Sequence, residues 1–245
     1  MSSITWTPRA VASEAGRCRL EPWRAVEAQH IASTRRLLDS NEEQAVLEEL
    51  LDESKPKVPA SIAGLDYLLA TPFRYPPWIR GSRFRSAADP GVFYAAEERR
   101  TACAELGYWR WRFVTDSSGL AKLGLGPVAH TVFQIQVAAS AIDLRQPPLS
   151  RDAKKWTDPN NYAATQALAA VVRQTPVSVI RYESVRDPAK GGCAAILEPN
   201  AFANQKPLAY QTWFLTVTPT ASAWQRDGEK FEFVWPRTRS LKPPA

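Results

Sequence analysis

The sequence predicts an α+β fold with a mainly antiparallel sheet and a packed core, in one large domain or one domain with an extension. Helical patterns dominate the first part of the chain, strands and helices mix in the middle, and strand patterns follow towards the end, an order typical of α+β proteins. The length of 245 residues suits one large domain, or one domain with an extension. With 44% apolar and 23% charged residues, the composition favours a packed core and argues against global disorder.

The N-terminal part predicts helices. Residues 1–20 predict no regular element, whereas residues 22–53 read as two helical runs, WRAVEAQHIASTRRLLDS and NEEQAVLEELLDE. The second run carries an apolar stripe at helical spacing, formed by Val46, Leu47, Leu50 and Leu51. Asn41 can cap its start, and SKPKVP ends it. The stretch IAGLDYLLA over 62–70 fits a short helix or a strand.

The middle of the chain changes character at residue 71. Residues 71–85 are predicted to be irregular, because three prolines within seven residues exclude a regular helix. GVFYAA over 91–96 predicts a short strand, and EERRTACAELGYWRW begins a helix. Further elements are a long strand over 130–144, a helix over 158–174, and strands over 176–185, 193–199, AYQTWFLTVTP and EKFEFVWP.

The formal net charge of +6 favours an acidic partner, which could be nucleic acid, a phosphate-bearing ligand or an acidic protein. Arginines scattered over a surface would give the same balance. The three cysteines are far apart and the two histidines are isolated, so the sequence indicates neither disulfides nor a metal site. The N-terminus has no apolar signal core, and no run approaches about 18 apolar residues, so we expect a cytoplasmic protein without membrane contact.

Two polar candidates lie around the short strand. Arg83 occupies a tight turn, GSRFR, where its planar fork suits a phosphate or a carboxylate, although a surface arginine or a structural salt bridge explains it as well. Tyr94 shares a strand face with Val92, while Phe93 points the other way. The Tyr94 ring could belong to the core or offer a flat face to a planar ligand.

Two further candidates are Glu105 and Ser184. Glu105 lies among small residues in the helix, in ACAEL, where a carboxylate often faces a polar cavity; an exposed helical glutamate is the simpler alternative. Ser184 follows the apolar strand PVSVI, at a strand end of the kind that often carries site residues. The chain contains no GxSxG motif, no Walker motif and no dinucleotide fingerprint.

Taken together, these pieces resemble the RES domain, a family named for an Arg, a Glu and a Ser. The family pattern is a Gly-rich turn with Arg, a short strand ending in Tyr, a helix with Glu and a later Tyr-x-Ser-x-Arg. Here the corresponding stretches are GSRFR, GVFY, TACAEL and YESVR, over roughly 70–215. They place Arg83, Tyr94, Glu105 and Ser184 in the family's polar set.

Further stretches match the family less closely. FRYPP resembles its upstream Arg-Tyr pair, which gives Arg74 and Tyr75. The usual turn is Gly-Gly-Arg-Trp-Asn, and one extra residue separates Arg83 from the tyrosine, so Arg85 is a competing choice. The resemblance divides the chain into a helical N-terminal extension over 1–69, as in a longer RES subgroup, and a RES domain over 70–245.

The resemblance implies a fold similar to that of ADP-ribosyltransferase toxins, and a reaction in which NAD⁺ is the substrate and no metal or resident cofactor takes part. Cleavage of the nicotinamide–ribose bond builds positive charge on the ribose, which the Glu105 carboxylate would stabilise. Tyr94 would stack on the nicotinamide or the ribose. Arg83, with Arg74 and Tyr75 nearby, would hold the pyrophosphate, and Ser184 would bind the ribose or orient the carboxylate.

The acceptor could be water or inorganic phosphate as co-substrate, and some relatives transfer ADP-ribose to a protein. The resemblance also implies a small helix-turn-helix antitoxin of the Xre/ParS/MbcA type as partner. An inactive RES domain that acts only by binding is a further alternative. A basic nucleic-acid-binding module is disfavoured, because no recognition helix or aromatic-basic ladder stands out.

Overall fold

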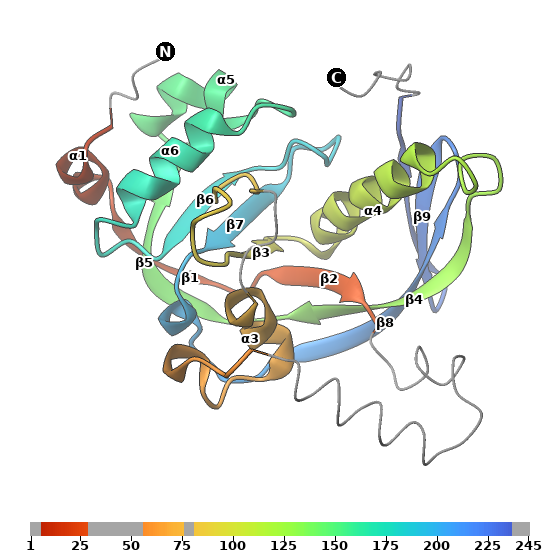
Figure 1. The fold of residues 1–245 in the computed structure, drawn as a ribbon, viewed down its shortest axis with the longest axis horizontal. Helices are drawn as coiled ribbons and strands as arrows, with labels where there is room; N and C mark the ends of the chain where they lie inside the picture. Colours follow the sequence, from red (N-terminus) through yellow and green to blue (C-terminus); the bar gives the residue numbers. More distant parts are fainter. Residues whose placement is uncertain (1–5, 29–55, 76–80, 237–245) are drawn as a thin grey trace.

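The structure, a computed structural model, describes residues 6–28, 56–75 and 81–236. Its framework is one curved sheet of ten strands in the order β1-β5-β6-β7-β3-β2-β4-β8-β9-β10 (Figure 1). Every neighbouring pair is antiparallel except β5–β6, which is parallel. The predicted α+β class with a mainly antiparallel sheet and flanking helices is therefore confirmed.

The start of the chain differs from the prediction. Residues expected to be irregular form helix α1 (Pro8–Ser13), capped by the Thr7 side chain, and strand β1 (Gly16–Leu20). The predicted helix from residue 22 is wrong at its beginning, which is strand β2 (Trp23–Glu27). β2 pairs with β4 on one side and with β3 on the other, and this pairing overrides the helical propensity of Arg, Ala and Glu.

The rest of that predicted helix, including the stripe from Val46 to Leu51, lies outside the described residues. The division of the chain at residue 69 stays a prediction. β1 and β2 precede that division, and both are strands of the same sheet as the elements that follow it.

The next segment is more helical than its prolines indicated. After the short 3-10 helix η1 (Ala60–Ile62), helix α3 (Tyr67–Arg74) begins at Asp66, whose side chain accepts a hydrogen bond from the Leu68 amide. The helix includes Pro72, so the irregular segment predicted from residue 71 begins only after Arg74. Pro72 lies in the last turn of this short helix, so the backbone donor that it lacks removes one hydrogen bond, and the helix ends two residues later.

The two elements that carry the candidate residues form as predicted. They are strand β3 (Phe93–Ala96) and helix α4 (Arg99–Asp116). The expected long strand over 130–144 is wrong, because the chain changes partners there and forms β4 (Leu125–Gln134) and β5 (Val137–Asp143). β4 pairs with β2 and β8, whereas β5 pairs with β1 and β6.

The later elements follow the prediction with two additions. The expected ones are α6 (Ala163–Val172), β6 (Val179–Glu183), β7 (Gly192–Ile196), β8 (Ala209–Val217) and β10 (Glu229–Val234). The sequence did not predict strand β9 (Ala221–Arg226). It also did not predict three short helices, which are η2 (Leu149–Asp152), α5 (Ala153–Trp156) and η3 (Pro199–Ala201). Asp227 and Gly228 have φ of 43° and 87°, as a tight hairpin between β9 and β10 requires.

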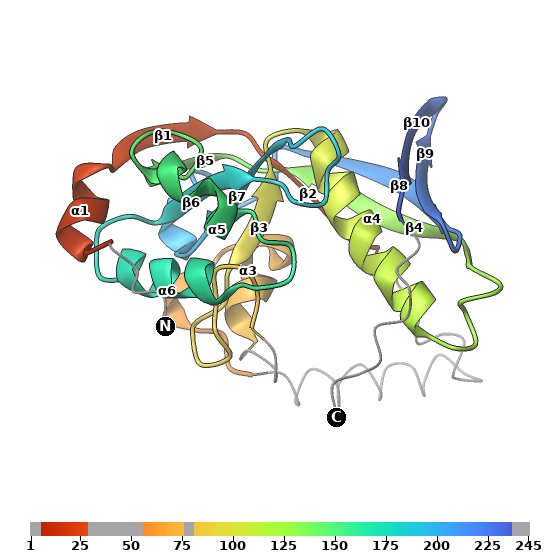
Figure 2. The same cartoon turned by 90° about the horizontal axis from the view of Figure 1, so that it is seen from above.

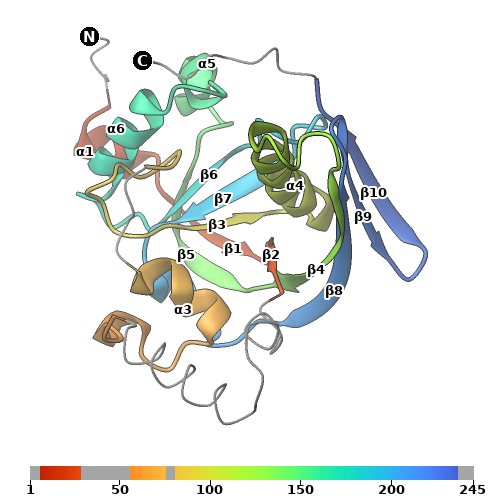
Figure 3. The ribbon, with the colours of Figure 1, turned by 45° about the vertical axis from the view of Figure 1, so that its right-hand side comes forward.

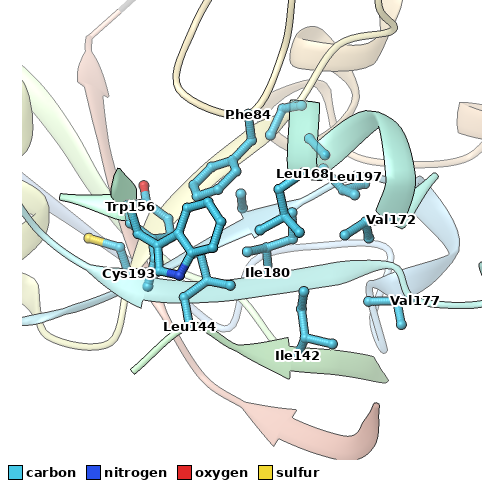
Figure 4. Packing of buried hydrophobic residues seen from close by; sticks show 14 of the residues in the cluster. Phe84, Ile142, Leu144, Trp156, Leu168, Val172, Val177, Ile180, Cys193 and Leu197 are labelled. Carbon is cyan, nitrogen blue, oxygen red and sulfur yellow. The ribbon is translucent and has the colours of Figure 1, made fainter. Parts of the chain in front are cut away.

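The helices cover both faces of the sheet. Figure 2 shows α6 and α4 to either side of β3, and Figure 3 shows α4 and α6 on one side of the strands and α3 on the other, with the sheet curving around α4. α6 packs on β5, β6 and β7, and α4 packs on β2, β8 and β9, whereas α3 belongs to the core on the opposite face. Phe84 and Trp156 fill the core under α6 (Figure 4).

Candidate active site

A pocket lies over the middle of the sheet, between α4 and the segment that leads into α6. Its volume is about 320 Å³, within the usual range of ligand sites. Its walls come from β2, β3, the turn over 81–83, one side of α4, Tyr162 and the loop that follows β6. These segments are far apart in the sequence, and the curvature of the sheet brings them together (Figure 1).

The best-defined polar contact at this pocket joins Glu105, which lines it, to Ser184, which is buried and does not belong to the lining. The Ser184 hydroxyl donates a hydrogen bond to Glu105 Oε1 at a distance of 2.5 Å, which is a short charge-assisted hydrogen bond. Ser184 Oγ in turn accepts from the backbone amides of Arg186, at 3.2 Å, and Asp187, at 2.9 Å. Because both acceptor positions of the hydroxyl are occupied, its proton is directed towards the carboxylate.

Asp187 fixes the loop that carries Ser184. Its buried carboxylate accepts from Thr101 Oγ1 at 2.8 Å and from the Ala189 amide at 3.0 Å, and it forms an ion pair with Arg100. Thr101 and Arg100 belong to the first turn of α4, where the helix dipole favours a negative charge. The loop over 184–187 is thereby attached to α4, the helix that carries Glu105.

Burial dominates the electrostatics of Glu105. It raises the pKa of the carboxyl above its ordinary value, and the negative charge of Asp187 acts in the same direction. The hydrogen bond from Ser184 and the positive charges of Arg186 and Arg83 oppose this rise. A carboxylate held between low-dielectric walls and nearby cations is an arrangement typical of functional sites.

Arg83 reaches the pocket from a tight turn. Ser82 and Arg85 pair their backbones across the turn, and Gln166 donates to both carbonyls. Gly81 is required there, since a Cβ would lie 2.5 Å from the Arg85 carbonyl oxygen. The Arg83 side chain is 7% exposed, and its Nη1 donates to the carbonyls of Trp156, at 2.9 Å, and Asp158, at 3.0 Å.

Tyr94 lines the pocket with its ring, while its hydroxyl supports the turn. The hydroxyl accepts from the Phe84 amide at 3.0 Å and is hydrogen-bonded to Ser82 Oγ at 2.7 Å. Burial raises the pKa of Tyr94, so the phenol stays neutral. Tyr94 therefore couples β3 to the turn that carries Arg83.

Among the other sequence candidates, the structure does not bring Arg74 and Tyr75 to the pocket lining. Arg74, at the end of α3, donates from Nε to the Pro56 carbonyl and lies 5.9 Å from the Tyr75 ring centroid. Of the two competing arginines, Arg83 lines the pocket, whereas Arg85 contributes its backbone to the turn.

The sequence analysis missed three pocket residues. Arg24, on β2, donates to the Tyr94 carbonyl at 2.8 Å, and burial lowers its pKa to about 10. It was overlooked because β2 was read as helix. The stretch YESVR contains Arg186, but its pattern predicts no role for this residue, and Tyr162 falls within the helix predicted over 158–174. WRAVE does not alternate apolar and polar residues, so no local signal indicated β2.

The pocket contains one cysteine, Cys193, whose chemistry is suppressed. Burial raises the thiol pKa of Cys193 well above its ordinary value, and the nearby Glu105 charge adds to this effect. A protonated thiol is a poor nucleophile. The lining residues that can act on a ligand are therefore the Glu105 carboxylate and the arginines, and Ser184 acts through Glu105.

The fold and the pocket define a class of α+β protein in which an Arg, a Glu and a Ser from three separate segments meet over a curved sheet. The model of the RES domain family matches residues 58–218, and the chain belongs to this family. The match begins before residue 70, where the sequence alone placed the start of the domain.

Comparison with curated proteins gives no match. Among solved structures, the "M. tuberculosis MbcT-MbcA toxin-antitoxin complex" contains a chain that is similar with 12% identity and a TM-score of 0.44. The similarity covers 84% of this chain and 87% of that one. Within the described ranges, no helix is long and apolar enough to span a bilayer.

Proposed function

We propose that the protein is a toxin enzyme that consumes NAD⁺ by cleaving the bond between nicotinamide and ribose. The observation that carries the proposal is the Glu105 carboxylate, held by Ser184 at 2.5 Å inside a pocket that also contains Arg83. NAD⁺ has the matching parts: a ribose that becomes cationic during cleavage and a pyrophosphate that needs cations. NAD⁺ is the substrate here and not a resident cofactor.

Glu105 stabilises the developing positive charge of the ribose, as carboxylates do in glycoside cleavage. Ser184 orients the carboxylate and keeps one of its oxygens fixed, so the other is left for the ribose. The bond from C1′ to the nicotinamide nitrogen breaks, and its electron pair leaves with nicotinamide. Water or inorganic phosphate then attacks C1′, giving ADP-ribose or its 1-phosphate.

Arg83 binds the pyrophosphate in this scheme, and the Tyr94 ring lies against the nicotinamide or the ribose. Glu105 must be ionised to act. Because burial raises its pKa, we expect nicotinamide release to increase with pH across a window that begins above the ordinary carboxyl value.

The test is release of free nicotinamide from NAD⁺ by the purified full chain, with and without phosphate. Glu105→Ala should lower the rate by about 10²- to 10³-fold, the effect of losing one group that stabilises transition-state charge. Glu198→Ala, an exposed glutamate outside the pocket, is the matched control and should keep the wild-type rate. A rate that is unchanged in Glu105→Ala would exclude the mechanism.

The same experiment separates the alternatives. Phosphate-dependent release indicates phosphorolysis, and phosphate-independent release indicates hydrolysis. Transfer of label from NAD⁺ to a protein, with slow free turnover, would indicate an ADP-ribosyltransferase. Salt-sensitive binding of DNA or RNA that does not change in Glu105→Ala would indicate a nucleic-acid-binding module.

We further propose that a small helix-turn-helix antitoxin restrains the enzyme by covering the pocket. Trp109 is 51% exposed at the pocket wall, and Phe113, one turn further along α4, is 57% exposed. Exposed aromatic surface of this kind is typical of protein interfaces. Co-expression with the gene product encoded beside this one should abolish nicotinamide release and yield a stable complex; if the two proteins do not associate, this part is wrong.

A further inference from the structure

Three arginines line the pocket, and each is held by groups other than carboxylates. They are Arg24, Arg83 and Arg186. In the part of the chain that the structure describes, none of the three forms an ion pair. Glu105 is the one carboxylate in the described lining, so the pocket has an excess of positive charge.

Two of these arginines meet at one tyrosine. The guanidinium carbon of Arg83 lies 4.6 Å from the centroid of the Tyr162 ring. Arg186 Nη2 donates to the Tyr162 hydroxyl at 3.2 Å and to the Pro159 carbonyl at 2.5 Å. Tyr162 thus contacts Arg83 with its ring and Arg186 with its hydroxyl, so both guanidinium groups are positioned at one residue of the pocket wall.

A second aromatic pair supports Arg186. Its guanidinium carbon lies 4.0 Å from the Tyr108 ring centroid and 5.4 Å from that of Trp109, both on α4. Cation–π contacts and carbonyl acceptors fix a guanidinium without neutralising its charge. A carboxylate partner would have cancelled that charge, and its absence from the described surroundings leaves the charge available to a ligand.

The burial of the pair makes such a ligand energetically important. Arg83 is 7% exposed and Arg186 is 8% exposed. Arg83 Nη2 is a buried donor without a hydrogen-bond partner. Burying a cationic donor without a partner is unfavourable, so a site of this kind is stabilised when an anion enters it.

We propose that Arg83 and Arg186, positioned by Tyr162, form a two-arginine clamp for a diphosphate group. Arg83 can take one phosphate through Nε and Nη2, since its Nη1 is held by two carbonyls. Arg186, whose Nη2 is held by Pro159 and Tyr162, can donate to the other phosphate from its remaining nitrogens, which a single arginine cannot do for both phosphates. The inference rests on the proposed function and assigns the substrate's pyrophosphate to a second arginine and a tyrosine. The same chemistry would also bind free inorganic phosphate, and the experiment separates the two sources.

Binding of three anions to the full chain is measured by calorimetry: inorganic pyrophosphate, ADP-ribose and inorganic phosphate. Arg186→Met should weaken pyrophosphate and ADP-ribose by about tenfold or more, the effect of losing a charge-assisted pair. Tyr162→Phe keeps the ring against Arg83 and removes the hydroxyl that Arg186 uses, so it should weaken both anions by a smaller factor. Arg186→Lys keeps the charge and should restore only part of the affinity.

Arg112→Met is the control for net charge. Arg112 lies outside the pocket on α4, paired with Asp116, and its loss should leave all three affinities unchanged. Thermal unfolding of each variant checks that it is folded. If Arg186→Met binds pyrophosphate and ADP-ribose like the wild type, the clamp is refuted. The clamp is also refuted if the wild-type protein binds neither pyrophosphate nor ADP-ribose.

The outcomes for the clamp and for the enzyme are distinct. Anion binding that depends on Arg186, without nicotinamide release, keeps the clamp and refutes the proposed reaction. Nicotinamide release by a protein whose affinities for pyrophosphate and ADP-ribose do not depend on Arg186 keeps the proposed reaction and refutes the clamp. If inorganic phosphate alone depends on Arg186 while ADP-ribose does not, the site takes free phosphate and the diphosphate assignment is wrong.

Discussion

Replacing Ser184 with alanine tests how the candidate site is assembled. The hydroxyl makes three hydrogen bonds at once: it donates to Glu105 and accepts from the amides of Arg186 and Asp187. Ser184 is 1% exposed, so water does not replace the hydroxyl readily. Alanine removes one charge-assisted bond and leaves two backbone N–H groups without an acceptor.

The size of the effect follows from these bonds. A hydrogen bond to a charged group contributes about 1.5–3 kcal/mol, and an unsatisfied buried donor costs about 1–3 kcal/mol. Since the loop can relax, we expect the free energy of unfolding to fall by roughly 2–4 kcal/mol in total. For a chain of this length, that lowers the melting temperature by roughly 5–15 °C.

Urea denaturation and nicotinamide release measure the two consequences in the same samples. Loss of the serine donor raises the pKa of Glu105 further, so the acidic limb of the pH–rate profile should move to higher pH. Ser117→Ala is the control: it removes an exposed hydroxyl that bonds to the Phe113 carbonyl, and it should change stability by less than about 0.5 kcal/mol. If Ser184→Ala is as stable as the wild type and its pH profile does not move, the serine does not organise this site.

Two further substitutions, one at Glu105 and one at a glycine, are expected to change the stability of the fold. Burial raises the pKa of Glu105, so the folded chain holds this proton more tightly than the unfolded chain, and stability decreases as pH rises through that window. Glu105→Gln removes this dependence, and urea titrations at several pH values should show the variant gaining stability relative to the wild type as pH increases. A Cβ on Gly91 would lie 1.8 Å from the carbonyl oxygen of Pro72, a backbone atom of α3, so Gly91→Ala should displace α3 and cost about 1–3 kcal/mol in thermal unfolding. Gly126→Ala, which meets no atom within 4 Å, should have little effect, and equal losses in both variants would contradict the steric argument.

The sequence predicted the segments whose local patterns agree with their final environment. β3 and α4 are such segments, and the residues Tyr94 and Glu105 that they carry line the same pocket wall. Ser184 was placed correctly at the end of β6, next to Glu105. The elements follow from strand alternation, helix periodicity and turn residues, which are local properties of the chain, whereas the grouping of Ser184 with Glu105 came from the resemblance to the RES family.

What the sequence could not predict depends on distant partners. WRAVE has good helix formers, yet it becomes a strand because β4 supplies five residue pairs from Trp23–Gln134 to Glu27–His130. The run over 130–144 has no Gly or Pro to interrupt it, so the change of partners between β4 and β5 leaves no local mark. Tyr162 could not be connected with Arg83 and Arg186, because that contact exists only after three segments have folded together.

The central position of β2 has a consequence for biosynthesis. The residues of β2 are synthesised early, whereas those of its partners β3 and β4 are synthesised later. Trp23 pairs with Gln134, more than a hundred residues downstream. Contacts at such separation form slowly, because a long loop must close first. The candidate site therefore cannot assemble before the chain as far as β7, which carries the last lining residue, Cys193, has been synthesised.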